Sequence, residues 1–174
     1  MFKENGRSMI KKTWNVIEKI MYVMVVKVLH ITILEKNWES FLQFVKFGII
    51  GVSNTVISYV IYIASLFVLQ KNSLFETTDY LLAQILGFLL SVLWSFYWNR
   101  KYVFDADQGQ VPWLQALWKT YVSYAFTGLF LNTVLSMLWV ELLGISKVIA
   151  PIFNIVINVP INFLMNKFWA FKKK

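Results

Sequence analysis

Four asparagines recur at every fourth position near the end of the chain: Asn154, Asn158, Asn162 and Asn166. Side chains spaced by four lie on one face of an α-helix, so a helix here carries a stripe of carboxamides. A carboxamide that faces acyl chains without a hydrogen-bond partner is costly. In a membrane helix the stripe therefore faces protein or water. It either joins helices through hydrogen bonds or lines a polar path for a lipid headgroup.

Basic and aromatic residues follow an asparagine at two places in the chain. The segment Asn99-Arg100-Lys101-Tyr-Val-Phe104 recurs 67 positions later as Asn166-Lys167-Phe-Trp-Ala-Phe171. Arginine can grip a phosphate with two N–H groups and lysine with a point charge, so the pattern predicts an anionic lipid-phosphate site. The alternative is a helix end anchored by aromatic rings and oriented by positive charge. The predicted phosphate-binding residues are Asn99, Arg100, Lys101, Asn166 and Lys167.

The repeated motif belongs to a longer internal repeat. One apolar segment carries Gly51, Asn54 and Thr55, and a later one carries Gly128, Asn132 and Thr133. The stripe positions, shifted back by 67, fall on Gly87, Ser91, Ser95 and Asn99, whose small side chains allow close helix contact. We expect these two faces to pair with each other. The predicted headgroup path consists of Asn54, Ser91, Ser95, Asn132, Asn154, Asn158 and Asn162.

The composition indicates a lipid environment for these elements. Hydrophobic residues make up 58% of the 174 residues and charged residues 15%, which departs from the composition of soluble domains. A membrane core about 30 Å thick requires roughly 20 helical residues. Four segments meet that requirement, approximately Phe47 to Leu69, Tyr80 to Trp98, Thr120 to Leu143 and Val148 to Met165. The predicted fold is an all-α membrane protein with four transmembrane helices.

The positions of lysine and arginine predict the orientation of these helices. Only Lys71 and Lys147 of the 17 basic residues lie in the loops after the first and third spans. Cytoplasmic loops retain positive charge, so both termini and the central loop are predicted to be cytoplasmic. Each pair of spans then returns to its starting side. The two-helix repeats are therefore parallel, related by an axis along the membrane normal.

The residues before the first span predict an amphipathic helix over Thr13 to Leu34. Apolar side chains such as Ile17, Ile20 and Met24 share one face, which suits the headgroup boundary. A fifth span is the alternative, although Lys27 would lie inside a short apolar run. The predicted domains are a leader over 1–43, a transmembrane domain over 44–171 and a basic tail over 172–174. The repeats cover about 44–104 and 118–171.

The side chains indicate no enzyme. None of the nine acidic residues lies centrally in a span, and the chain has no cysteine and no glycine-rich phosphate loop. We therefore predict no catalytic residue, no metal and no cofactor. The formal charge of +8 is explained by topology, so nucleic acid is not a predicted partner.

These segments together resemble the GtrA-like family over roughly Phe44 to Phe171. The resemblance is carried by Phe47-Gly48, Gly51, Asn54-Thr55, Ser95 to Phe104, and Asn166 to Phe171. It implies a small four-span protein of the bacterial cytoplasmic membrane that moves polyprenyl-phosphate-linked sugars for glycosylation of teichoic acids or other cell-surface polysaccharides.

The expected function is non-enzymatic flipping of a polyprenyl-phosphate sugar, with membrane lipids as further partners. The alternative is a membrane anchor or scaffold for a polyprenol-phosphate glycosyltransferase, because related domains are fused to such enzymes. A small multidrug exporter is disfavoured, since the first span lacks the embedded glutamate needed for proton coupling. Four short spans give one protomer little wall around a sugar, which favours a homo-oligomer.

Overall fold

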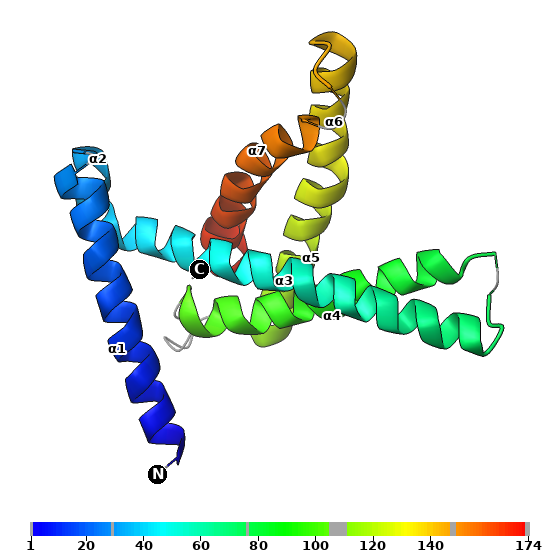
Figure 1. Ribbon diagram of the computed structural model, residues 1–174, viewed down its shortest axis with the longest axis horizontal. Coiled ribbons are helices and arrows are strands. Elements are labelled where there is room, and N and C mark those ends of the chain that lie inside the picture. The colour runs from blue at the N-terminus through cyan, green and yellow to red at the C-terminus, as the bar shows by residue number, and fades with distance from the viewer. Residues whose placement is uncertain (1, 29, 76, 105–110, 147–148, 173–174) are drawn as a thin grey trace. The chain divides into compact units, whose positions relative to one another are not determined.

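A computed structural model describes residues 2–28, 30–75, 77–104, 111–146 and 149–172 (Figure 1). The described residues form helices and connecting turns, and no strand occurs among them, so the predicted all-α class is confirmed. The chain divides into two compact units, Met1–Val45 and Lys46–Lys174. The division falls inside the continuous helix α3 (Trp38–Lys71).

The first unit consists of a long helix, a short helix and the beginning of α3. Helix α1 (Phe2–Tyr22) continues as a π-helical stretch over Val23–Val28 and is followed by α2 (Thr32–Lys36). The helix thus begins well before the predicted start at Thr13. Apolar side chains along it remain exposed, including Ile20 at 55% and Met24 at 56%. This unpartnered apolar face is the feature from which the sequence predicts a helix at the headgroup boundary.

Aromatic contacts hold the first unit together at its turn. The rings of Tyr22 and Trp38 meet edge to face at 5.1 Å, and the Tyr22 hydroxyl donates a hydrogen bond to Glu35 at 2.7 Å. The bond to the Glu35 carboxylate raises the pKa of the Tyr22 phenol, because it stabilises the protonated form.

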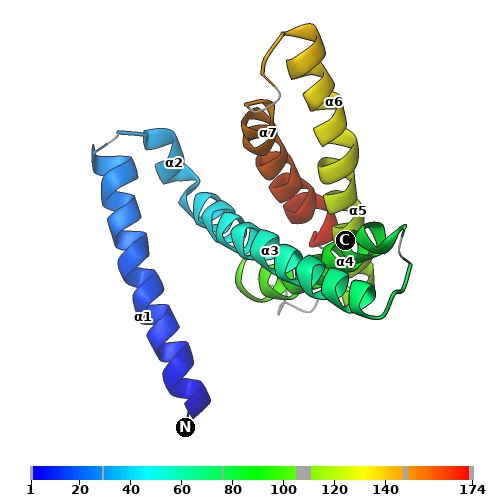
Figure 2. The same ribbon diagram turned by 45° about the vertical axis from the view of Figure 1, so that its right-hand side comes forward.

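The second unit contains two helical hairpins. In the first, α3 and α4 (Asp79–Tyr102) lie side by side in both views (Figures 1 and 2). In the second, α5 (Trp113–Ala125) and α6 (Asn132–Met137) belong to one continuous helix over Trp113–Leu142, which returns as α7 (Ala150–Met165). The π-helical stretches that complete these helices are Phe126–Leu131, Leu138–Leu142 and Asn166–Ala170.

Local chemistry ends and restarts these helices. Gln70 at the end of α3 donates to the Asp79 carboxylate at the start of α4 at 3.0 Å, which closes the first hairpin. In the second hairpin Gly144 has φ +65°, and the Ile145 N–H bonds back to the Trp139 carbonyl at 2.8 Å. A glycine in this conformation is the usual C-terminal stop of a helix. Pro151 lies in the first turn of α7, where a missing N–H costs nothing.

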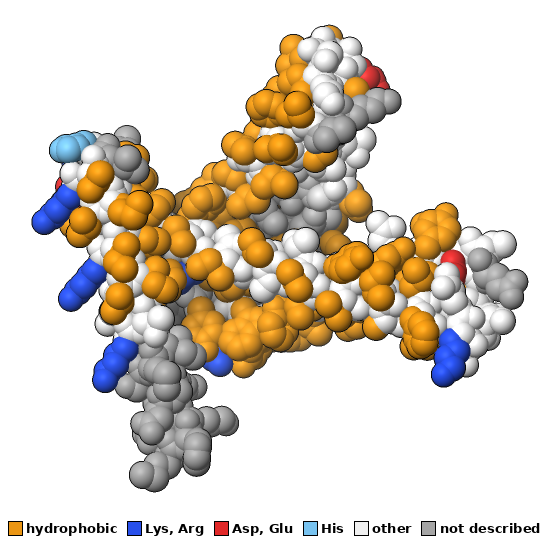
Figure 3. All heavy atoms as spheres, in the orientation of Figure 1, with side chains coloured by type: hydrophobic (Ala, Val, Ile, Leu, Met, Phe, Trp, Pro, Cys, Tyr) orange, Lys and Arg blue, Asp and Glu red, His pale blue; other side chains and the backbone are white. Residues whose placement is uncertain are grey.

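Three helices are long and apolar enough to cross a membrane: Trp38–Lys71, Asp79–Tyr102 and Trp113–Leu142. The fourth predicted span is helical from Ala150 to Ala170 but is not among them, because its asparagines lower the mean hydropathy. Hydrophobic side chains cover most of the visible surface of the second unit (Figure 3). Val52, Leu129 and Val156 are each at least 65% exposed, as lipid-facing residues should be. The protein is therefore a multi-pass membrane protein.

The predicted orientation can be tested by labelling, since the chain has no cysteine that would add background. Cysteine introduced as Ser73→Cys or Ser146→Cys is expected to react with a membrane-impermeant maleimide in intact cells. Gly109→Cys, in a loop outside the described residues, is expected to react only after permeabilisation, because that loop adjoins the basic residues Arg100 and Lys101. Reaction of Gly109→Cys in intact cells would contradict the two-plus-two topology.

Candidate functional site: polar clefts within the helical hairpins

Asn154 lies at the centre of the polar contacts in the second hairpin. Its side chain is 2% exposed, and its amide group donates to Asn132 Oδ1 at 2.9 Å and to Ser136 Oγ at 2.7 Å. Its carbonyl oxygen accepts from Trp139 Nε1 at 3.0 Å. These partners lie on the α5–α6 helix, so one carboxamide satisfies polar groups of the helix that packs against α7.

The rest of the stripe also bonds within its own hairpin. Asn158 donates to Asn132 Oδ1 at 3.4 Å, and Asn166 accepts from Thr120 Oγ1 at 3.3 Å. Asn162 Oδ1 accepts from Asn166 Nδ2 at 3.0 Å. The prediction that the stripe pairs with the small-residue face of α4 is therefore wrong, because these side-chain hydrogen bonds stay within the second hairpin. An asparagine stripe specifies a polar face but not which neighbouring helix meets it.

The small-residue face of α4 has other neighbours. A Cβ atom at Gly87 would lie 3.0 Å from the Ser58 carbonyl oxygen of α3, so glycine allows the two helices to approach. Ser91 is buried and donates to the Phe88 carbonyl of its own helix at 3.2 Å. Ser95 shares a 2.6 Å hydrogen bond with the Tyr124 hydroxyl of α5. Ser95 thereby connects the two hairpins.

The two motif copies make matching contacts at the end of the hairpins where they lie. Phe104 and Phe171 stack with ring centroids 4.6 Å apart and planes inclined by 17°. Phe96 stacks on Phe171 at 5.7 Å, and Phe163, which follows Phe96 by 67 positions, stacks on Phe104 at 6.0 Å. The phenylalanine three residues before each motif copy thus stacks on the last residue of the other copy.

The two motif asparagines are fully buried and share two of their bonds, although Asn166 Oδ1 also accepts from Thr120 and Asn99 Oδ1 has no partner among the described residues. Asn99 donates to the Ser95 side chain one turn earlier at 3.0 Å, as Asn166 does to the Asn162 side chain. The backbone carbonyl oxygens of Asn99 and Asn166 accept from the backbone N–H groups of Phe104 and Phe171 at 3.0 and 2.9 Å, respectively. These bonds order the helix ends that carry the basic residues. The predicted contact of the two asparagines with phosphate stays a prediction.

The basic residues of the first motif copy lie in different surroundings. Arg100 is half-buried, and its Nη2 donates to the Val111 carbonyl at 3.0 Å, whereas its Nη1 is buried without a partner among the described residues. Lys101 is exposed, with its ammonium 5.1 to 5.4 Å from the ring centres of Tyr97, Trp98 and Tyr102. Lys101 also donates to the Tyr97 hydroxyl at 3.5 Å, so in this copy the exposed charge is the lysine ammonium, and the arginine keeps one buried N–H group without a described partner.

The second motif copy presents lysine in place of arginine. The Lys167 ammonium lies 5.5 Å from the Phe163 ring and 5.8 Å from the Phe168 ring. Nearby, Lys119 donates to the Trp169 carbonyl at 3.0 Å. The structure places Lys167 on the π-helical stretch that continues α7 and Arg100 on α4, each beside aromatic residues near its own motif copy.

A cleft of about 520 Å³ lies in the first hairpin and is called the first cleft. Asn54 and Ser58 of α3 and Gln84 and Ser91 of α4 line it, together with Tyr124 from the second hairpin. The Asn54 Oδ1 atom is buried, with no hydrogen-bond partner in the described part of the chain. The first cleft therefore brings together two residues of the predicted headgroup path, Asn54 and Ser91.

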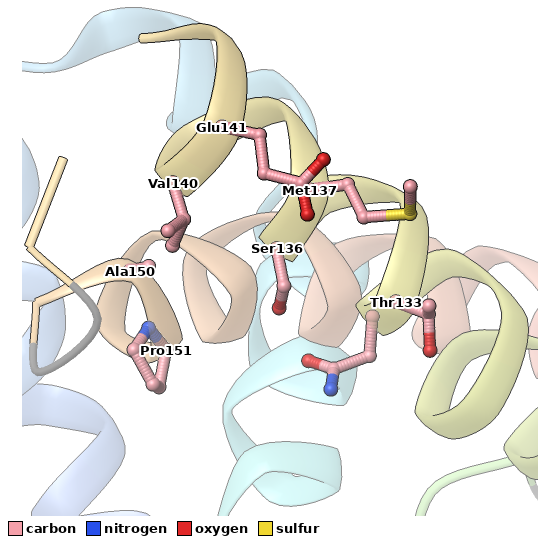
Figure 4. A pocket seen from close by; sticks show the side chains of 8 residues that line it. Thr133, Ser136, Met137, Val140, Glu141, Ala150 and Pro151 are labelled. Atoms are coloured by element: carbon pink, nitrogen blue, oxygen red, sulfur yellow. The ribbon is translucent and has the colours of Figure 1, made fainter. Parts of the chain in front are cut away.

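A second cleft, of about 370 Å³, lies at the corresponding place in the second hairpin. Figure 4 shows Ser136 and Val140 facing Ala150 and Pro151 across it. Asn132 also lines it, and Glu141 lies at its edge as an exposed residue. Asn132 and Asn154 of the predicted path are bonded to each other beside this cleft, whereas Asn162 lies two turns further along α7.

The two clefts reveal a residue pair missing from the predicted path. The segment Asn54-Thr-Val-Ile-Ser58 matches Asn132-Thr-Val-Leu-Ser136, and each segment lines one cleft. The predicted repeat includes only the Asn-Thr pair of each span and therefore omits these serines. Extending it by three residues would have found Ser58 and Ser136 from sequence alone.

The helices of the second unit are apolar on the outside, and polar side chains line two clefts between them. This arrangement is that of a multi-pass helical membrane protein. Residues 46–171 match the family described as GtrA/DPMS, transmembrane domain, and the chain belongs to this family. The match confirms the resemblance drawn from the sequence motifs. It begins at the residue where the second compact unit begins. A comparison with curated proteins gives no match to the chain.

Proposed function

We propose that the protein translocates a polyprenyl-phosphate-linked sugar across the cytoplasmic membrane, without catalysing a reaction. The observation that carries the proposal is the pair of clefts lined by polar side chains between the apolar helices of a chain of this family. A sugar headgroup that crosses the acyl region needs hydrogen-bond partners along its way. Asn54, Asn132 and their neighbours offer such partners within helices that are otherwise apolar.

In this proposal the chain spans the membrane four times as two parallel repeats, with both termini in the cytoplasm. The reciprocal stacks of Phe96 on Phe171 and of Phe163 on Phe104 support a twofold relation between the hairpins. The basic residues Arg100, Lys101 and Lys167 then gather at the cytoplasmic ends. There they receive the lipid phosphate before the sugar enters the clefts.

The test is leaflet exchange in reconstituted vesicles. Vesicles with the purified protein and a labelled short-chain polyprenyl-phosphate sugar are expected to exchange the label between leaflets faster than protein-free vesicles. Exchange should proceed in either direction, driven by the substrate gradient, because no intramembrane carboxylate has been identified for proton coupling. Exchange no faster than in protein-free vesicles would exclude autonomous translocation.

A second candidate function is recruitment of a polyprenol-phosphate glycosyltransferase. It is favoured by the first unit, which lies wholly outside the family match and presents the exposed apolar residues of α1. Under this alternative, deletion of residues 1–37 abolishes co-purification of the enzyme and leaves leaflet exchange at the protein-free rate. Exchange by the purified protein alone would favour the translocase.

A further inference from the structure

The two clefts differ in how their central asparagine is satisfied. In the second hairpin the Asn132 side-chain oxygen accepts hydrogen bonds from Asn154 at 2.9 Å and from Asn158 at 3.4 Å. In the first hairpin the matching oxygen of Asn54 is buried, and no described residue donates to it. One of two equivalent acceptors is thus occupied by the protein, and the other is left open.

The residues at the matching positions of α4 explain the difference. Positions 67 residues before Asn154 and Asn158 are Gly87 and Ser91. Gly87 has no side chain, and the Ser91 hydroxyl donates to the Phe88 carbonyl of its own helix. Neither residue gives Asn54 the N–H group that Asn132 receives.

The first cleft, in which this donor is missing, is also the larger of the two clefts. The first cleft measures about 520 Å³ and the second about 370 Å³. Beside Asn54 the first cleft presents the polar side chains of Ser58, Gln84 and Tyr124. A buried acceptor without a partner is destabilising, and a ligand that supplies a donor removes that cost.

We propose that the first cleft is a binding site for a hydroxyl or amide group of an amphiphilic ligand, with Asn54 Oδ1 as its acceptor. In the second hairpin the Asn154 carboxamide occupies the place that the ligand takes in the first. The two repeats are then unequal: the acceptor in the first cleft binds the ligand, and the acceptor in the second is occupied by Asn154. That the amphiphile is a glycolipid rests on the proposed function, whereas the site itself does not.

The first cleft is separate from the predicted phosphate site. Ser91 and Arg100 are nine positions apart on α4, which is about 13 Å along a helix. A phosphate held by Arg100 therefore leaves the acceptor of Asn54 free. Ligands that carry only a sugar or only a phosphate can distinguish the two sites.

The test uses photoreactive alkyl glucoside and alkyl N-acetylglucosaminide, which offer hydroxyl groups alone or with an amide. Vesicles with the full-length protein are labelled at increasing probe concentration, and labelled peptides are identified by mass spectrometry. We expect labelling of α3 and α4 at the first cleft. Asn54→Leu should raise the half-saturating concentration about fivefold, the effect of one neutral hydrogen bond. The probe with the lower half-saturating concentration shows whether a hydroxyl or an amide group of the ligand is the donor to Asn54.

Two further variants complete the test. Ser91→Asn places a carboxamide where Asn158 stands in the second hairpin, so it should close the first cleft and weaken labelling by a similar factor. The matched variant Asn132→Leu is compared for stability alone, and it should unfold at lower temperature than the wild type because Asn154 and Asn158 lose their acceptor. Asn54→Leu should unfold no earlier than the wild type, since it removes an unpaired acceptor.

The proposal is overturned if the wild type is not labelled at the first cleft, or if Ser91→Asn labels as tightly as the wild type. It is also overturned if Asn54→Leu lowers the unfolding temperature as Asn132→Leu does, which would make Asn54 a structural residue. If Asn54→Leu fails to insert, Ser91→Asn decides alone. Labelling without leaflet exchange would retain the site and exclude translocation, so the two proposals fail separately.

Discussion

Replacing Asn154 with leucine is expected to destabilise the second hairpin by about 2 kcal/mol or more. The substitution removes the donor to Asn132 and Ser136 and the acceptor for Trp139. Hydrogen bonds between membrane helices contribute about 0.6 kcal/mol on average and up to about 1.7 kcal/mol. The leucine also leaves the Trp139 N–H without its partner in a half-buried site. Reversible unfolding in mixed micelles, followed by tryptophan fluorescence, measures the loss.

Asn158→Leu is the matched control, one turn along the same helix. Among the described residues the Asn158 side chain donates one long hydrogen bond, of 3.4 Å to Asn132 Oδ1, and its own oxygen is buried without a partner. We expect a loss well below that of Asn154→Leu, or a small gain. Equal losses for the two variants would mean that the stripe acts through polarity alone and not through the network centred on Asn154.

The helices could be predicted largely from sequence, because length and hydropathy are local properties. The predicted spans over Tyr80 to Trp98 and Thr120 to Leu143 fall within or almost within the helices of the structure. The extension of α3 back to Trp38 was not predicted, because Lys46 and Glu39 end the apolar run without ending the helix. Charge limits the part of a helix that lies in lipid, whereas glycine, proline and capping groups end the helix itself.

The site was less predictable because it depends on which helices meet. Periodicity placed Asn154 and Asn158 on one face of α7, but the neighbour of that face follows from hairpin packing. The small residues of α4 were predicted to meet this face, yet Gly87 packs against Ser58. The difference between the Asn54 and Asn132 acceptors arises from contacts across the hairpins. A local sequence pattern does not show which residue of the facing helix donates to each asparagine.

The inequality of the clefts bears on the mechanism of translocation. Two equivalent parallel repeats would offer two equivalent sites, with no inherent reason for a ligand to prefer one. Because Asn154 occupies the Asn132 acceptor, the proposed binding half is the first hairpin, which also carries Arg100 and Lys101. The proposed route therefore runs along one hairpin, from basic end to polar cleft. The second hairpin supports it through the reciprocal phenylalanine stacks.

Arg100→Gln is expected to weaken binding of a short-chain polyprenyl phosphate about tenfold or more. A charge-assisted hydrogen bond contributes about 1.5 to 3 kcal/mol, against about 1 kcal/mol for a basic residue near an anionic membrane surface. In the structure Nη2 bonds to the Val111 carbonyl, which leaves Nη1 directed to a buried position without a described partner. Binding is measured by equilibrium displacement of a fluorescent polyprenyl phosphate in nanodiscs, after cysteine labelling has shown unchanged topology.

Lys167→Gln is the control for charge, since it removes one positive charge from the matching position of the second motif copy. We expect a smaller loss than for Arg100→Gln, because the ammonium has no planar fork and lies beside the Phe163 and Phe168 rings. Arg100→Lys should fall between the two, because it retains the charge and loses the fork. Affinities near that of the wild type for all three variants would identify these residues as topology signals. The search for the headgroup site would then move to Asn158 and Asn162.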